Sequence, residues 1–297
     1  MLESLRFGVE IETTGMDRHR LADAIQSVVG GRVISDYRAY QITDPAGQTW
    51  RVVPDASLSG GENSGEIVSP ILTYADIPEL QRVVRAVRAA HARVDHTCSV
   101  HVHVGAEAFD AAAIARLAKM VHKQERLIEK ALGISDSRLA RYCRPMDEDF
   151  MRRLETSRPR TREQISEAWY GRRNVLPQRY DGQRYHGLNL TSLLVRGTFE
   201  FRWFQGSLHA GEIKSYVQFC LALAAKALKS RAASSRRREY APGSAKYDFR
   251  VFLLGLGMIG DEFKTARFHL LKRLSGSSAW KHGGRASSTP PEDRAAA

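Results

Sequence analysis

The chain has 297 residues, of which 43% are hydrophobic and 26% are charged, and its formal net charge is +12 at pH 7. These values are those of an ordinary folded protein, long enough to bury a full core in one large domain or two modest ones. No apolar run approaches the roughly 20 residues that a helix needs to span a bilayer, and the best candidate, 217–228, is interrupted by Lys226 and is expected to be a core helix.

The three cysteines, Cys98, Cys143 and Cys220, are odd in number and widely spaced, which predicts reduced thiols. The first six residues contain no signal-peptide core. These features predict a cytoplasmic protein without a membrane partner, and they leave the oligomeric state open.

The charge is unevenly spread, because the first third of the chain is acidic and the remainder is basic. This asymmetry suits a cleft in which carboxylates hold a cation and arginines hold an anion, and it suits nucleic-acid binding equally well. The net charge therefore does not separate these two functions.

The first expected element is a strand over 6–13. Alternation puts three apolar side chains on one face of this strand and Glu10 and Glu12 on the other. Two carboxylates on one strand face repel each other unless a positive charge lies between them, and a divalent cation would supply that charge. For an isolated Glu-x-Glu, the alternative is the solvated face of an edge strand.

The later elements follow the same two periodicities, two for strands and 3.6 for helices. Further strands are expected over 32–34, 37–43, 49–54, 66–72, 99–104, 185–193 and 198–204. Helices are expected over 19–29, 77–93, 110–132, 211–230 and 247–274. Strand pairs and long helices in this order predict the α+β class, with a mainly antiparallel, curved sheet that has helices on one face and an open polar face.

The sequence predicts a single catalytic domain over 1–274. Within it, 136–184 is expected to be a basic insertion of short helices and loops, and 229–239 a basic linker or an exposed helix end. Residues 275–297 are rich in Ser, Gly, Pro and Ala, and this composition predicts a disordered tail.

Two later strands carry pairs of polar residues of the types that bind metals or take part in catalysis. The sixth expected strand places His101 and His103 on the face opposite its valines, and two imidazoles on one strand face are a common arrangement of metal ligands. The last expected strand has Glu200 and Arg202 on one face, a pair that a cross-strand ion pair would also explain.

If the apolar faces of these strands share one core, their polar residues share one open face. That face would carry Glu10, Glu12, Glu66, His101, His103, Asn189, Glu200 and Arg202. Carboxylates gathered without compensation would be costly, and oxygen-rich ligation with a histidine suits Mg²⁺ or Mn²⁺ better than a structural zinc ion. We therefore expect two or more divalent ions on this face.

Other nucleotide-binding and catalytic motifs are absent from the sequence. There is no G-x-x-x-x-G-K-[ST], no G-x-S-x-G, and no cysteine in a local nucleophile context. A bound nucleotide would then be held by metal ions on a sheet and by arginines, rather than by a phosphate-binding loop.

Five segments in order carry a family resemblance: F-G-x-E-x-E, D-x-S-L followed by G-E-I-V-S-P-I-L, H-V-H-V-G, L-N-L and T-F-E-F-R-x-F. Together they resemble the amidoligases, carboxylate–amine ligases of the glutamine synthetase and glutamate–cysteine ligase superfamily. The resemblance covers about Arg6 to Ala227, and it implies a fold like the catalytic domain of glutamine synthetase.

The resemblance also implies that Mg²⁺ or Mn²⁺ ions bind around ATP. The implied metal ligands are Glu10, Glu12, Glu66, one of His101 and His103, and Glu200. Arg202, Glu200 and Glu66 would be the catalytic residues, with Arg202 contacting the transferring phosphate. His103, Asn189 and Arg202 would bind the cofactor.

Two further acids have weaker assignments. Asp55 matches an acidic position of the amidoligase pattern for which the resemblance gives no role. Glutamine synthetase has two middle glutamates where this chain has Glu66, and Glu62 is a candidate for the second.

The predicted function is an ATP-dependent carboxylate–amine ligase that forms an amide or peptide-like bond through an acyl phosphate. Its partners would be a carboxylate and an amine, in small molecules, peptides or proteins. Two alternatives stay open. One is a metal-dependent hydrolase that uses His101 and His103 to activate water, and the other is a basic nucleic-acid-binding protein.

Overall fold

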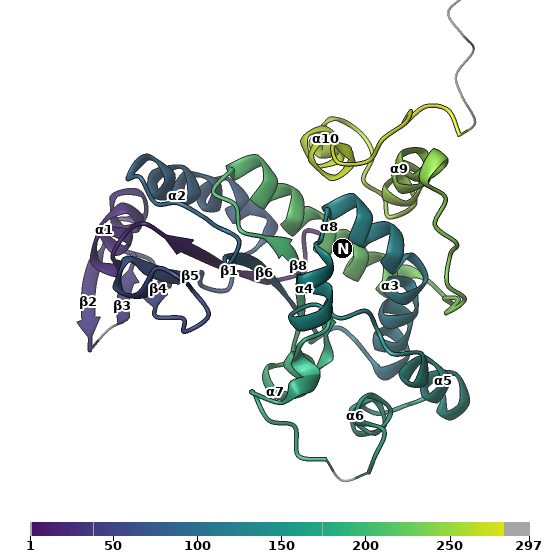
Figure 1. Ribbon diagram of the computed structural model, residues 1–297. Coiled ribbons are helices and arrows are strands. Elements are labelled where there is room, and N and C mark those ends of the chain that lie inside the picture. Colours follow the sequence, from purple (N-terminus) through teal and green to yellow (C-terminus); the bar gives the residue numbers. More distant parts are fainter. Residues whose placement is uncertain (1, 38, 174, 282–297) are drawn as a thin grey trace, which may run out of the picture.

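The computed structural model of the chain describes residues 2–37, 39–173 and 175–281. In these ranges eight strands form one sheet in the order β2-β3-β4-β5-β1-β6-β8-β7, and all neighbouring strands are antiparallel. The strands are β1 (Phe7–Thr14), β2 (Arg32–Asp36), β3 (Ala39–Thr43), β4 (Thr49–Val53), β5 (Ser64–Val68), β6 (Ser99–Gly105), β7 (Leu188–Asn189) and β8 (Thr198–Gln205). The predicted α+β class with an antiparallel sheet is confirmed, and β1 lies in its interior (Figure 1).

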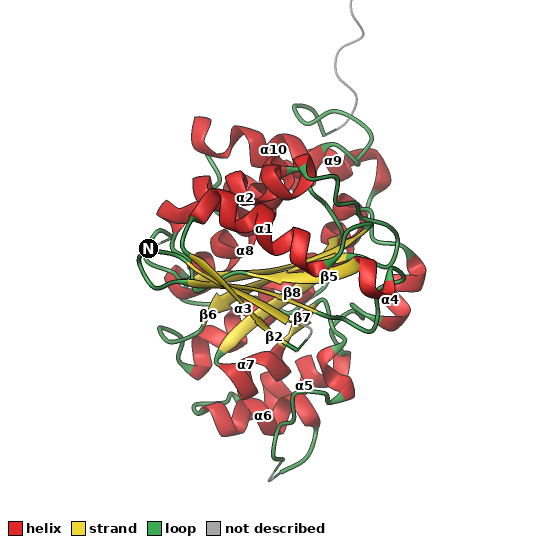
Figure 2. Cartoon of the chain, turned by 90° about the vertical axis from the view of Figure 1, so that its left-hand side faces the viewer, coloured by secondary structure: helices red, strands yellow, loops and turns green. Residues whose placement is uncertain are grey.

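The helices form two groups on opposite sides of the sheet. They are α1 (Arg18–Val29), α2 (Ile77–Ala89), α3 (Ala111–Leu132), α4 (Asp136–Arg141), α5 (Glu148–Ser157), α6 (Arg162–Tyr170), α7 (Leu190–Arg196), α8 (Ala210–Lys229), α9 (Ala245–Gly255) and α10 (Lys264–Leu271). Figure 2 shows α1, α2, α8, α9 and α10 on one side of the sheet and α5, α6 and α7 on the other. The second group lies toward the β7–β8 edge, which leaves the face over β1 and β5 open (Figure 1).

The apolar face of β1 packs into the core. Phe7, Val9 and Ile11 are each at most 2% exposed. Burying an aliphatic or aromatic side chain of this size contributes roughly 1.5–3 kcal/mol. Buried apolar side chains from Leu5 to Leu274 form one connected core, so the alternation of β1 fixes its glutamates on the opposite face.

The strand predicted over 185–193 is wrong over most of its length, because the chain enters a helix at Asn189. β7 has two residues and α7 follows at once. The Asn189 side-chain oxygen accepts the backbone N–H of Thr191 at 2.9 Å, which caps the helix. The alternating Gly-Leu-Asn-Leu run that indicated a strand is therefore the approach to a helix N-cap.

The C-terminal helical region consists of two helices. Gly257 and Gly260, with φ of +89° and +80°, separate α9 from α10, because these backbone angles interrupt a helix. Residues 230–240, here called the strap, connect α8 to α9 without helix or strand. The strap runs against α3, where the Arg238 N–H donates to the Lys123 carbonyl at 2.9 Å.

Residues 275–281 also form no helix or strand, and the rest of the predicted tail, 282–297, lies outside the described residues. Over the ranges that the structure describes, every helix is too short or too polar to cross a bilayer.

Candidate active site

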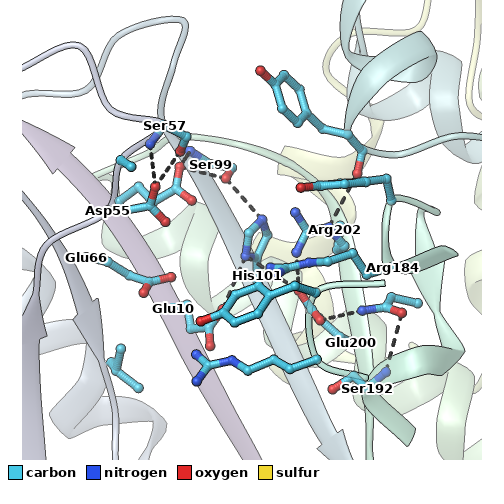
Figure 3. A pocket seen from close by; sticks show the side chains of 18 of the residues that line it. Glu10, Asp55, Ser57, Glu66, Ser99, His101, Arg184, Ser192, Glu200 and Arg202 are labelled. Carbon is cyan, nitrogen blue, oxygen red and sulfur yellow. Dashed lines mark hydrogen bonds and ion pairs between the residues drawn. The ribbon is translucent and has the colours of Figure 1, made fainter. Parts of the chain in front are cut away.

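A cavity of about 920 Å³ opens on the uncovered face of the sheet (Figure 3). The polar faces of β1, β5, β6 and β8 form its floor, β4 with the loop 54–57 forms one wall, and α4, the loop 179–185 and α7 form the other. Seven of the eight residues predicted to share a polar face line this cavity. The eighth, His103, lies next to it, with Nε2 at 3.4 Å from Oε1 of Glu10.

The register of the sheet brings the acids and histidines together from strands far apart in the sequence. Cross-strand partners on this face are Glu12 and Glu66, Glu10 and His101, and His103 and Glu200. Neighbouring strands lie about 4.8 Å apart, so side chains in such positions meet. The predicted common face is therefore present in the fold.

Three groups of side chains have ligand atoms that all lie within 4.8 Å of one another, among the residues described. They are Glu10–Glu66–His101, Glu10–His103–Glu200 and Glu12–Asp55–Glu66. Because they overlap through Glu10 and Glu66, they form one continuous cluster, here called the acidic cluster. Each group offers three ligand atoms at a spacing that allows all of them to bind one cation.

Glu10 is at the centre of the acidic cluster. Its Oε2 lies 3.2 Å from Nδ1 of His101, and its Oε1 lies 3.4 Å from Nη1 of Arg196. Burial opposes the charged form of Glu10, but the charge of His103 and the hydrogen bond from His101 outweigh it. They hold the pKa of Glu10 well below its ordinary value, so this carboxylate is ionised.

Glu200 and Arg202 form a buried ion pair, in which Arg202 Nη1 contacts Glu200 Oε1 and each side chain is 7% exposed. Asn189 Nδ2 donates to the other oxygen of Glu200 at 2.7 Å, and Arg202 Nε donates to the Tyr142 carbonyl at 3.3 Å. Burial would raise the pKa of Glu200, but the Arg202 guanidinium together with His103 and His101 outweighs it and lowers this pKa to about 2. Both partners are thus charged and fixed in direction.

At the opposite end of the acidic cluster, the negative charge of the carboxylates is less well balanced by positive groups. Glu12 Oε2 accepts the Ser99 N–H at 2.6 Å and the Ser99 hydroxyl at 2.7 Å. Burial, reinforced by the carboxylates of Glu10 and Glu12, raises the pKa of Glu66 well above its ordinary value. This end of the site therefore takes up a proton or a cation.

The two histidines have different surroundings. His101 lies between Glu10 and Ser99, whose Oγ is 3.0 Å from its Nε2. His103 Nδ1 is 3.1 Å from the Thr198 hydroxyl, whereas its buried Nε2 has no hydrogen-bond partner, since Glu10 is out of line for one. Burial lowers the pKa of His103, but the carboxylates of Glu10 and Glu200 together outweigh it and raise this pKa. A cation that bound this partnerless nitrogen would displace its proton, because a histidine ligates metals in its neutral form.

Of the two acids with weaker assignments, one belongs to the site and the other does not. Asp55 joins Glu12 and Glu66 in the third group, whereas Glu62 is exposed on the short turn Gly61–Asn63 and does not line the cavity. Sequence reasoning missed Arg196, which reaches Glu10 from α7. The sequence predicts a strand over 185–193 where α7 begins, and this prediction gives Arg196 no place on the polar face.

A comparison with known protein families gives a match over most of the chain. The model of the family described as "Putative amidoligase enzyme" matches residues 3–224, well over half of the chain. The chain belongs to the amidoligase family. Membership confirms the resemblance drawn from the motifs and supports ATP-dependent ligase chemistry in general, without specifying the reaction.

Solved structures and curated proteins add little to the family assignment. The bifunctional glutathione synthetase from Pasteurella multocida is similar to 92% of this amidoligase-family chain, with 13% sequence identity and a TM-score of 0.39. The chain spans 48% of that protein, about half its length. A TM-score this low transfers nothing from one protein to the other. No curated protein matches the chain.

Proposed function

We propose that this amidoligase-family protein is an ATP-dependent carboxylate–amine ligase. An oxygen of the substrate carboxylate attacks the γ-phosphorus of ATP, the bond to the β–γ bridging oxygen breaks, and ADP leaves. The amine nitrogen then attacks the acyl phosphate carbon, phosphate leaves with the carbon–oxygen electron pair, and the amine gives up a proton. The products are an amide, ADP and phosphate.

The observation that carries this proposal is the acidic cluster, which lies on the floor of one cavity beside the Glu200–Arg202 pair. An ATP-dependent ligase must neutralise the charge that spreads over the transferring phosphoryl group, and fixed cations do so most effectively in a partly buried site. All members of the cluster except His103, and both residues of the pair, line the cavity, so one ligand can meet them together.

The donor set fits divalent cations. It consists of carboxylate oxygens with imidazole nitrogens, the ligands that suit Mg²⁺ and Mn²⁺, and the buried Nε2 of His103 lacks any other partner. Glu10, His103 and Glu200 would hold one ion, and Glu12, Asp55 and Glu66 another, with His101 between them. Ions bound there would neutralise the phosphates of ATP and lower the barrier to phosphoryl transfer.

The remaining residues have positioning roles in this proposal. Arg202 contacts the transferring phosphate, and its direction is fixed by Glu200 and the Tyr142 carbonyl. Asn189 orients Glu200, because its amide nitrogen donates to that carboxylate while its amide oxygen caps α7. Ser99 orients Glu12 through two hydrogen bonds.

The decisive test is ATP turnover with Mg²⁺ or Mn²⁺ against pooled carboxylates and amines, with phosphate release and product mass as readouts. Glu10→Gln and Glu200→Gln are expected to abolish turnover and weaken Mg–nucleotide binding. Glu62→Gln is the matched control, since that glutamate is exposed outside the cavity. Tightly held zinc in a protein that binds no ATP would instead favour a metal-dependent hydrolase and overturn the proposal.

A further inference from the structure

The wall of the cavity that faces the acidic cluster is rich in arginine. Arg138, Arg141, Arg179 and Arg184, here called the arginine wall, come from α4 and the loop 179–185. None of the four forms an ion pair with any residue that the structure describes. Four guanidinium groups without counter-ions on one side of a cavity indicate an anionic ligand.

Arg138 is the strongest observation in this wall. It is 9% exposed, and its Nη2 lies 3.4 Å from the carbonyl oxygens of Arg202 and Phe204. Its Nε is buried and has no hydrogen-bond partner. Leaving a buried donor of a charged group unpaired is costly, so an acceptor that came within reach of this Nε would stabilise the arginine.

Tyrosine rings hold part of the wall in place. The guanidinium carbon of Arg184 lies 5.5 Å from the ring centroids of both Tyr180 and Tyr185, and that of Arg179 lies 5.3 Å from Tyr180. Figure 3 shows Arg184 on the same side of the pocket as Arg202. All side-chain cations that the described residues contribute to the lining, apart from histidines, are arginines, and the planar fork of arginine matches a carboxylate through two parallel hydrogen bonds.

The cavity is not closed at this end. A shallower hollow of about 440 Å³ shares Arg141 and Tyr185 with it and continues outward past Arg144 to Asp181, Gly182 and Gln183. A ligand on the arginine wall can therefore extend out to the surface. A free amino acid would leave this second hollow empty, whereas a peptide would fill it.

We propose that the carboxylate substrate is an acidic peptide. One of its carboxylates reaches the acidic cluster and the transferring phosphate, and its neighbouring carboxylates bind Arg138, Arg141 and Arg184 as the chain leaves along the second hollow. This inference rests on the proposed ligase function. A nucleic acid is the other polyanion that arginines bind, and displacement of the peptide by one is an outcome of the test below.

The test measures binding of a penta-glutamate peptide by calorimetry, in the presence of Mg²⁺ and a non-hydrolysable ATP analogue. Its penta-glutamine counterpart and free glutamate are compared under the same conditions. The glutamate peptide is expected to bind at least about tenfold more tightly than either, as the loss of charged hydrogen bonds predicts. Arg141→Gln and Arg184→Gln should each weaken it by about tenfold without changing the affinity for the ATP analogue.

Arg172→Gln is the matched control, because that arginine is exposed in the same basic segment but does not line the cavity. Equal binding of the glutamine peptide or of free glutamate would overturn the inference. So would displacement of the glutamate peptide by a short oligothymidylate, or a loss of nucleotide rather than peptide affinity in the two variants. If the nucleotide binds and the glutamate peptide does not, this inference fails alone; if the wild type binds no nucleotide, the proposed function fails.

Discussion

Glu12 and Glu66 are directly opposite each other on β1 and β5, on the same face of the sheet and within ligand distance of Asp55. Like charges directly opposite each other destabilise a strand pair. The fold thus holds two carboxylates side by side, and only a bound cation or a proton relieves their repulsion.

The first prediction is that Glu66→Gln stabilises the metal-free protein and removes its stabilisation by metal. In chelator at pH 8 the variant should unfold about 1–4 °C higher than the wild type, because the repulsion across the strand pair is gone. With Mn²⁺ at about 100 times its Kd the wild type should gain about 2.7 kcal/mol and the variant much less. Thermal unfolding by circular dichroism measures both, with Glu62→Gln as the control. Equal Mn²⁺ stabilisation in wild type and variant would contradict a metal role for Glu66.

The second prediction concerns Gly187, whose carbonyl accepts the Arg202 N–H at 2.8 Å. A Cβ added at Gly187 would lie 1.8 Å from Nε1 of Trp203, so Gly187→Ala must displace a buried indole. We expect a loss of about 1–3 kcal/mol in the free energy of unfolding, measured by urea denaturation. Gly182→Ala is the control, since a Cβ there meets nothing within 4 Å. Similar losses in the two variants would show that close packing at Gly187 is not the cause.

The third prediction separates the charge of Arg202 from its shape. Arg202→Lys keeps the positive charge beside Glu200, but one ammonium cannot replace both the contact with that carboxylate and the bond to the Tyr142 carbonyl. Phosphate release should fall by about 100-fold or more, as when a fixed transition-state donor is lost. Arg172→Lys should leave it unchanged. Full activity in Arg202→Lys would mean that the charge alone suffices.

The fourth prediction is a pH dependence of stability that comes from outside the cavity. Glu125 on α3 is fully buried, and both of its oxygens accept the Met146 N–H at 3.0 Å. Burial, opposed in part by that N–H and reinforced by Glu129, raises the pKa of Glu125 from 4.5 to about 8. Between these two values the folded protein binds this proton more tightly than the unfolded chain does. The free energy of unfolding should therefore fall as pH rises, by up to about 1.4 kcal/mol per unit.

Glu125→Gln should remove this contribution, so that urea midpoints at pH 5.5 and pH 7.5 differ less in the variant than in the wild type. Glu239→Gln, an exposed acid on the strap, serves as the control and should keep the wild-type slope. An unchanged slope in Glu125→Gln would assign the pH dependence to other groups.

The sequence predicted the parts of the site that depend on period-two alternation. Glu10, His101, His103 and Glu200 were placed on one face because apolar neighbours on their strands had to be buried. Alternation says which face a side chain occupies but not which strands are neighbours, so the pairing of Glu12 with Glu66 needed the register.

Other parts of the site left no periodic signal. Arg138 and Arg184 lie in a basic segment without a clear pattern, and only the fold shows that they face the acidic cluster. Asn189 follows an alternating run that suits a strand, but its side chain caps a helix, because Asn competes for backbone N–H groups at helix starts. Local capping chemistry overrode the alternating pattern there.

The interior position of β1 has a consequence for how the protein is made. In the chain, α1 and the strands β2 to β4 separate β1 from β5, and β6 follows only after α2. β8, which pairs with β6, begins nearly two hundred residues after β1. Closing such long loops slows folding. While the ribosome is still adding β8, the edge of β6 is unpaired and the acids of β1 lack the ion pair on β8 that completes their surroundings. Nascent chains interrupted before residue 205 should therefore be prone to aggregation, and ligand binding should arise only in the last stage of folding.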